Sequence, residues 1–216
     1  IILPLSILVI LGMIMVASSS MYVADDIASD PFYFTKRQII FVSVGLITMT
    51  IFLLLPSNLL FKTDWIFMLI SVLLLIALFI PDVGTSVNGS IRWIRLGSIN
   101  IQPSEICKFS LILYISGYSV RRMSEIDSLR SFLKPLALLF VISILIMGQP
   151  DLGSTAIVSL LVVGILFYAG ISFSQLGLLI LLIALLGYVA ITDSEYRLAR
   201  VLAFRDPFAT EVVLNA

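Results

Sequence analysis

Three charged side chains stand where the sequence is otherwise apolar, namely Glu105, Lys108 and Asp151. Glu105 and Lys108 are three residues apart, which puts them on one helix face with the acid nearer the amino end, as the helix dipole favours. Because a buried ion pair rarely gains more than its desolvation costs, stability alone does not explain this pair. The spacing favours a polar site lining a cavity, with an ion pair that fixes helix register as the alternative.

Asp151 lies between two apolar segments. It follows Pro150 at the end of one segment and precedes Ser154 and Thr155, where the next segment begins. An acid at this position caps a helix, because its carboxylate accepts from free N–H groups and favours the positive end of the dipole. Capping alone, and capping combined with a role in a site, both fit the sequence.

Arginines recur in the connections between apolar segments. Arg92 and Arg95 alternate with apolar residues, Arg197 and Arg200 lie one helical turn apart, and Arg37 closes the first connection. A guanidinium group binds phosphate oxygens through two parallel hydrogen bonds. Several arginines at one membrane surface therefore favour an anionic headgroup as ligand, and ordinary interfacial arginines are the alternative.

The composition excludes several classes of function. Of the 216 residues, 60% are hydrophobic and 12% are charged, whereas an average soluble domain has about 25% charged residues. The 13 basic and 13 acidic residues cancel, so no net field favours nucleic acid. Histidine is absent, which removes the commonest general base and metal ligand, and the single cysteine, Cys107, excludes an internal disulfide.

These residues must be positioned by membrane-spanning helices. A span needs about 20 predominantly apolar residues, or about 17 at the short end. Seven segments qualify, which predicts an all-α transmembrane bundle with spans near residues 1–18, 38–55, 65–80, 105–120, 135–148, 154–170 and 176–192.

Two connections carry further information. In the connection 83–102, an Asn88–Gly89 turn flanked by alternating residues predicts a small structured element at the outer interface. The connection 121–134 is short and holds four basic residues, which places it in the cytoplasm and the odd-numbered connections outside.

A set of ordered motifs resembles the SEDS family, which includes FtsW and RodA. The motifs are SVNGSIRWI at 86–94, QPSE at 102–105 with Lys108, QPDLGS at 149–154, YRLAR at 196–200 and DPF at 206–208. DPFYF at 30–34 and FLKP at 132–135 look more like the FtsW branch. The resemblance covers nearly the whole chain.

The resemblance implies a peptidoglycan glycosyltransferase of about ten spans that polymerises lipid II on the outer face of the bacterial cytoplasmic membrane, at the division septum. It implies a class B penicillin-binding protein and other division proteins as partners. It also implies a cavity cluster of Glu105, Lys108 and Asp151, with lipid II pyrophosphate held by Arg37, Arg92, Arg197 and Arg200. It implies no certain cofactor, and an acidic cavity beside pyrophosphate could hold a divalent cation, although no ligand spacing here establishes one.

The chain departs from the family pattern at its ends. It begins at Ile1 without an initiating Met, and relatives carry their catalytic aspartate in an outer loop within a His-Thr-Asp stretch that is not found here. We therefore expect a chain truncated at both ends, with the catalytic aspartate beyond Ala216. Two other readings stay open, namely a lipid II flippase and a non-catalytic membrane scaffold of the division machinery.

Overall fold

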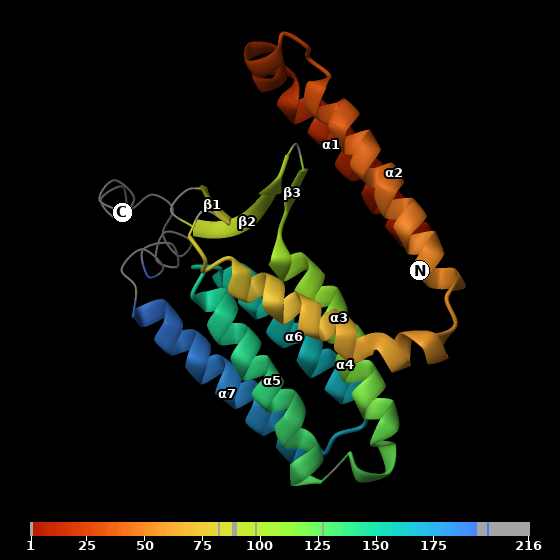
Figure 1. Ribbon diagram of the computed structural model, residues 1–216, viewed down its shortest axis with the longest axis vertical. Coiled ribbons are helices and arrows are strands. Elements are labelled where there is room, and N and C mark those ends of the chain that lie inside the picture. Colours follow the sequence, from red (N-terminus) through yellow and green to blue (C-terminus); the bar gives the residue numbers. More distant parts are fainter. Residues whose placement is uncertain are drawn as a thin grey trace. The chain divides into compact units, whose positions relative to one another are not determined.

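The structure is a computed structural model that describes residues 2–193 except 82, 88, 89, 98 and 127, together with residue 198. Within these residues the α-helices are α1 (Ile2–Ala28), α2 (Tyr33–Leu54), α3 (Ser57–Ala77), α4 (Pro103–Arg121), α5 (Leu129–Met147), α6 (Leu152–Tyr168) and α7 (Phe173–Thr192). A small sheet of β1 (Gly84–Val87), β2 (Ser90–Leu96) and β3 (Ile99–Ile101) lies between α3 and α4 in the chain (Figure 1). The chain forms two compact units, 1–59 and 60–216.

The helical fold class predicted from the sequence is confirmed, and a helix forms at each of the seven predicted spans. Five of these helices, α1, α2, α3, α5 and α7, are long and apolar enough to cross a membrane. Helix α6 is apolar but has only 17 residues, and α4 carries more polar and charged residues along its 19. The helices extend beyond the predicted spans mainly at their starts, because several helices begin before the apolar run does.

The first unit is a hairpin of α1 and α2, and its connection is shorter than predicted. The sequence predicts a connection from Ser18 to Arg37, yet α1 continues to Ala28. The hydroxyls of Ser19 and Ser20 donate to the carbonyl oxygens of Met15 and Val16, one turn back. Because serine can bond within the helix in this way, a run of serines need not end it.

The connection between α1 and α2 is held by Asp30. Its carboxylate accepts from the backbone N–H of Phe32 at 3.1 Å and from the Lys36 ammonium at 2.7 Å. The Lys36 hydrogen bond and then the Phe32 amide hold the pKa of Asp30 below its ordinary value of 3.8. A lowered acid pKa stabilises the folded form at pH values above the ordinary pKa, and this stabilisation is lost as the pH falls through the lowered pKa of Asp30.

The second unit packs α4, α5 and α7 against α6, with the sheet beside the start of α4 (Figure 1). Small and branched residues fill the core, in which Leu111, Ile115, Ile142, Val158 and Val162 are fully buried. Cys107 belongs to the same core, as its apolar surroundings in the sequence predict. Between α3 and α4, the Ser71 hydroxyl donates to the Ser110 hydroxyl at 2.6 Å.

The sheet is antiparallel with strand order β1-β2-β3. It corresponds to the structured element predicted in the connection 83–102. Val87 pairs with Ser90 across the β1–β2 connection, and the predicted Asn88–Gly89 turn lies outside the described residues. The sheet returns the chain from α3 directly into α4, where Pro103 takes the first helical position. Proline suits that position because its missing N–H would have no helical partner there.

A hydrogen bond from α4 compensates for a proline inside α5. Pro135 has no N–H, so the carbonyl oxygen of Ser131, four residues earlier, lacks its helical partner. The Tyr118 hydroxyl donates to this oxygen at 3.0 Å in a buried position. Tyr118 thereby joins the last turn of α4 to the first turn of α5.

Replacing Tyr118 with Phe should destabilise the fold by about 1–3 kcal/mol, because a buried carbonyl oxygen loses its only compensating donor. The free energy of unfolding in detergent micelles measures this loss. Tyr114→Phe is the matched control, since Tyr114 lies one turn earlier on α4 and its hydroxyl makes no hydrogen bond among the described residues. Equal effects of the two substitutions would contradict the role given to the Tyr118 hydroxyl.

Candidate functional site

Arg92 on β2 contacts the turn between α5 and α6. Its Nη2 donates to the carbonyl oxygen of Pro150, and its Nη1 lies 3.7 Å from Asp151 Oδ1. The Arg92 side chain is 34% exposed and that of Asp151 is 7% exposed. Nε of Arg92 is buried and has no hydrogen-bond partner among the described residues. The guanidinium group therefore connects the sheet to the start of α6 and keeps one unused donor.

Asp151 is the N-cap of α6. Its Oδ1 accepts from the backbone N–H of Ser154 at 3.1 Å, and its Oδ2 accepts from the Ser154 hydroxyl at 2.7 Å. Ser154 Oγ also lies 3.5 Å from Ser104 Oγ in the first turn of α4. The predicted cap is confirmed. The Asp151 carboxylate also faces the Arg92 guanidinium group, so it does more than cap the helix. The starts of α4 and α6 and the strand β2 thus meet at one place.

Glu105 and Lys108 form the ion pair that their spacing predicts. Lys108 Nζ lies 2.6 Å from Glu105 Oε1, and the Lys108 side chain is 16% exposed while that of Glu105 is 59% exposed. No hydrogen bond or ion pair connects either residue to Asp151 within the described part of the chain. The three predicted cluster residues therefore form two neighbouring groups, related through Ser104, which precedes Glu105 and contacts Ser154.

A pocket of about 360 Å³ is lined by Ile91 and Pro150, the chain neighbours of Arg92 and Asp151, and by neither charged residue. Its walls come from the end of α3, the sheet and the α5–α6 turn, and they include Phe79, Ile91 and Gln149. Gln149 is 3% exposed, and its amide donates to the Leu75 carbonyl oxygen at 3.3 Å. The pocket is therefore mostly apolar, and no charged side chain lines it.

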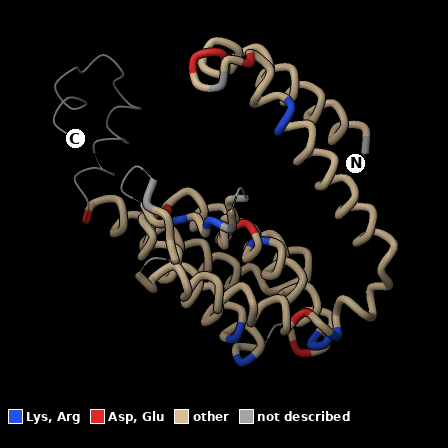
Figure 2. Tube along the Cα trace, turned by 45° about the horizontal axis from the view of Figure 1, so that its top comes forward, with Lys and Arg blue, Asp and Glu red and all other residues tan. Residues whose placement is uncertain are grey.

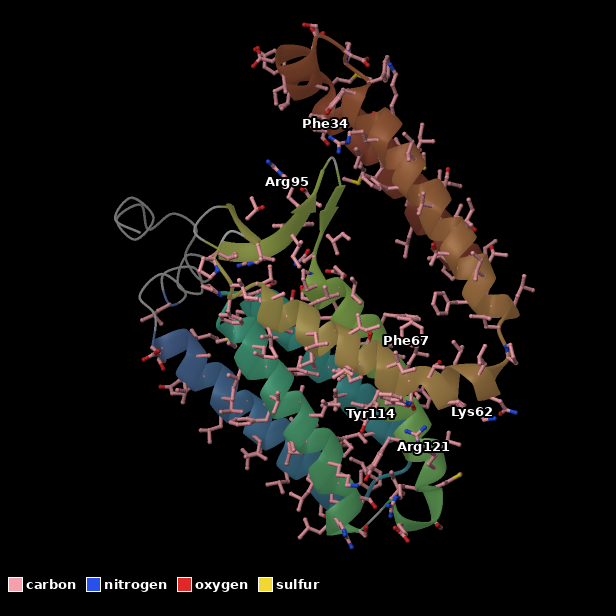
Figure 3. The ribbon with its side chains drawn as sticks, in the orientation of Figure 1. Phe34, Lys62, Phe67, Arg95, Tyr114 and Arg121 are labelled. Carbon is pink, nitrogen blue, oxygen red and sulfur yellow. The ribbon has the colours of Figure 1, made fainter. Side chains whose placement is uncertain are left out.

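The other predicted arginines are placed differently. Arg37 lies in the first unit, where its Nη1 donates to the Tyr33 hydroxyl at 3.0 Å and its guanidinium carbon lies 5.7 Å from the Tyr33 ring centre. Arg197 and Arg200 lie outside the described residues. Arg95, also on β2, is exposed and points away from the helices (Figure 3). The structure thus places one of the four predicted lipid II ligands, Arg92, at the site of Asp151.

A metal ion in a protein is held by several oxygen, nitrogen or sulfur ligands close together. Among the described residues no group of three or more histidine, cysteine, aspartate or glutamate side chains could hold one. Glu105 and Asp151 each pair with a cation, Lys108 and Arg92. The suggestion of a divalent cation stays a prediction, and we derive no chemical step through a metal.

A second charged group was missed by the sequence prediction. The predicted spans 38–55 and 65–80 leave Asp64 in the connection between them. In the structure, α3 begins at Ser57 and includes Asp64, which is 1% exposed. Arg121 Nη1 donates to Asp64 Oδ2 at 2.7 Å and to the Phe61 carbonyl oxygen at 2.9 Å. A Cβ atom at Gly117 would clash with Asp64 Oδ2, so glycine is required there. Because Arg121 neutralises Asp64, the helix can start before the apolar run.

The two charged groups lie at opposite ends of the second unit. Figure 2 shows its charged residues gathered towards the two ends of the helices, and Figure 3 shows Arg121 and Lys62 at the end away from the sheet. Long apolar helices with charges confined to their ends are typical of membrane proteins with several spans. The fold and charge pattern therefore define a multi-pass helical membrane protein.

The family is shown by the match of residues 1–212 to the cell cycle protein family of FtsW, RodA and SpoVE. The chain belongs to this SEDS family. It is 39% identical over 206 residues to a probable peptidoglycan glycosyltransferase FtsW of Legionella pneumophila, covering 94% of this chain and 52% of that protein. A protein of the same name from Aliivibrio salmonicida is 39% identical, with coverages of 93% and 50%. The chain spans about half the length of these curated relatives.

Solved structures have the same fold. The crystal structure of the rod shape determining protein RodA of Thermus thermophilus matches with a TM-score of 0.60 and 24% identity, covering 82% of this chain and 58% of that one. A chain from a peptidoglycan synthase complex, described as coordinating polymerization and crosslinking, matches with a TM-score of 0.65 and 26% identity, with coverages of 91% and 59%. The chain is thus an FtsW-like homologue.

Substitutions of Asp64 and of Arg121 should lower the free energy of unfolding by different amounts. Arg121→Met leaves a buried carboxylate without its cation and should cost about 3–5 kcal/mol. Asp64→Asn leaves an arginine that is 46% exposed and can be hydrated, and should cost about 1 kcal/mol. Free energies of unfolding in detergent micelles measure both. The double variant Asp64→Leu/Arg121→Met should recover most of the loss, and a double variant as unstable as Arg121→Met would contradict this account.

Proposed function

We propose that the chain is part of an FtsW-type peptidoglycan glycosyltransferase that polymerises lipid II on the outer face of the cytoplasmic membrane. Its curated relatives carry this activity in their names. We further propose a class B penicillin-binding protein as partner and the division septum as the place of action. The likeness to a chain from a peptidoglycan synthase complex supports the partnership.

The chemistry requires a base, cations and a dry site. The hydroxyl oxygen of the acceptor sugar forms a bond to the anomeric carbon of the donor with inversion, while the bond from that carbon to the pyrophosphate oxygen breaks. The hydroxyl proton passes to a carboxylate base, and the leaving group is undecaprenyl pyrophosphate. Cations stabilise the charge that develops on this leaving group. We assign no residue of this chain as the base.

The observation that carries the proposal is the position of Arg92. Its guanidinium group is held by the Pro150 carbonyl oxygen and faces Asp151, its side chain is 34% exposed, and its neighbour Ile91 lines a mostly apolar pocket. A pyrophosphate with an attached polyprenyl chain combines the two chemistries that this place offers. Arg37, Arg197 and Arg200 remain proposed ligands of the same pyrophosphate, and Lys108 and Glu105 remain proposed lining residues of the cavity.

Lys108→Ala in the full-length protein should lower lipid II polymerisation by at least tenfold at equal expression, because Glu105 loses its only cation among the described residues. Formation of glycan polymer from lipid II in detergent measures the effect. Undiminished polymerisation would exclude the proposed role of the Glu105–Lys108 pair. The same preparation in liposomes tests the alternatives: movement of labelled lipid II without polymer favours a flippase, and partner binding without either activity favours a scaffold.

The substitution Asp151→Asn tests separately the helix-capping role of Asp151 and the role of its negative charge. Asparagine caps a helix about as well as aspartate, so the stability of α6 should change little. The variant loses the negative charge that faces Arg92, so polymerisation by the full-length protein should fall by about tenfold or more. Thermal unfolding and polymerisation are measured on the same sample. Full activity in Asp151→Asn, with loss of stability in Asp151→Ala, would show that Asp151 acts only as a helix cap.

A further inference from the structure

The start of α5 carries two cations for which the structure shows no acidic partner. Arg130 and Lys134 are both exposed, and neither makes an ion pair within the described residues. They lie at the end of the second unit away from the sheet, where the bond from Tyr118 to Ser131 joins α5 to α4. Two other cations at this end are neutralised, since Arg121 pairs with Asp64 and Arg122 pairs with Glu125 at 2.7 Å. Lys62, also at this end, is exposed and makes no ion pair within the described residues, but it stands alone on α3.

This placement is unfavourable for the helix itself. Arg130 and Lys134 are four residues apart, so they share a helix face and repel each other. The amino end of a helix carries partial positive charge and favours anions, yet the first turn of α5 contains no acid. An anion bound at this face would reduce the repulsion between Arg130 and Lys134 and would supply the negative charge that the start of the helix favours.

Apolar side chains lie next to the cations. Leu129 is 64% exposed and Leu133 is 49% exposed, and they also lie four residues apart. The first two turns of α5 therefore present one apolar stripe and one basic stripe side by side. We call these four residues, Leu129, Arg130, Leu133 and Lys134, the α5 basic face. Acyl chains contact the first kind of stripe and phosphate groups the second, as on helices that lie at membrane interfaces.

We propose that the α5 basic face binds the headgroup of an anionic phospholipid. Helix α5 is one of the candidate membrane spans, so its first turns reach the depth at which headgroups and acyl chains meet. Arg130 and Lys134 hold the headgroup phosphate, and Leu129 and Leu133 contact the first carbons of the chains. This site lies at the other end of the unit from Arg92 and does not depend on the proposed glycosyltransferase activity.

Native mass spectrometry of the full chain in mixed micelles of phosphatidylglycerol and phosphatidylcholine tests the proposal. The protein should retain phosphatidylglycerol in preference to phosphatidylcholine. Each cation near an anionic lipid contributes about fivefold, so Arg130→Gln/Lys134→Gln should abolish a preference of about twenty-fivefold. Added salt should weaken the preference, because exposed charges are screened.

The matched control is Lys62→Gln/Arg122→Gln, which removes two exposed cations at the same end but outside the α5 basic face. It should change the preference by less than twofold. Equal loss in both double variants would show a general effect of net charge and overturn the proposal, as would a wild-type chain without preference. Displacement of the lipid by millimolar inorganic phosphate would also overturn it, because the site would then bind free phosphate. Circular dichroism confirms that both variants keep their helices.

Discussion

A polar group inside a membrane protein must find its partner within the protein, because hydrocarbon offers none. This constraint explains how the helices of the second unit pair. Asp64 is buried because Arg121 reaches it from the next helix. The Ser131 carbonyl oxygen, freed by Pro135, is bonded by Tyr118. Each contact joins two helices, so satisfying a polar group also fixes which helices are neighbours.

The same constraint builds the candidate site. Arg92 is carried by a strand of a small sheet, and its acceptors lie in the turn between α5 and α6. Asp151 accepts from the α6 backbone, from Ser154 and from Arg92, so one carboxylate connects a helix start to the sheet. Ser154 extends this connection to Ser104 on α4. Polar side chains therefore connect the sheet to the starts of α4 and α6.

Much of this arrangement could be predicted from the sequence. Apolar segment length predicts the seven helices, and residue spacing predicts the Glu105–Lys108 pair and the Asp151 cap, because all of these depend on contacts close in the chain. The partners of Asp64 and Arg92 could not be predicted, since they lie 57 and 59 positions away and depend on helix packing. Gly117 is a sequence signal for the Asp64–Arg121 contact, because a glycine inside a helix can mark a position where another residue packs closely against the helix.

The two acids near the sheet differ in what they can do. Asp151 is 7% exposed and uses both oxygens on protein donors, so a proton acceptor role would require breaking contacts that hold α6 and Arg92. Glu105 is 59% exposed and contacts only Lys108 among the described residues. The fixed acid therefore determines where the arginine lies, whereas the exposed acid remains able to face a bound molecule. Treating both as one cluster, as their proximity in sequence motifs suggests, would hide this division between a positioning carboxylate and an accessible one.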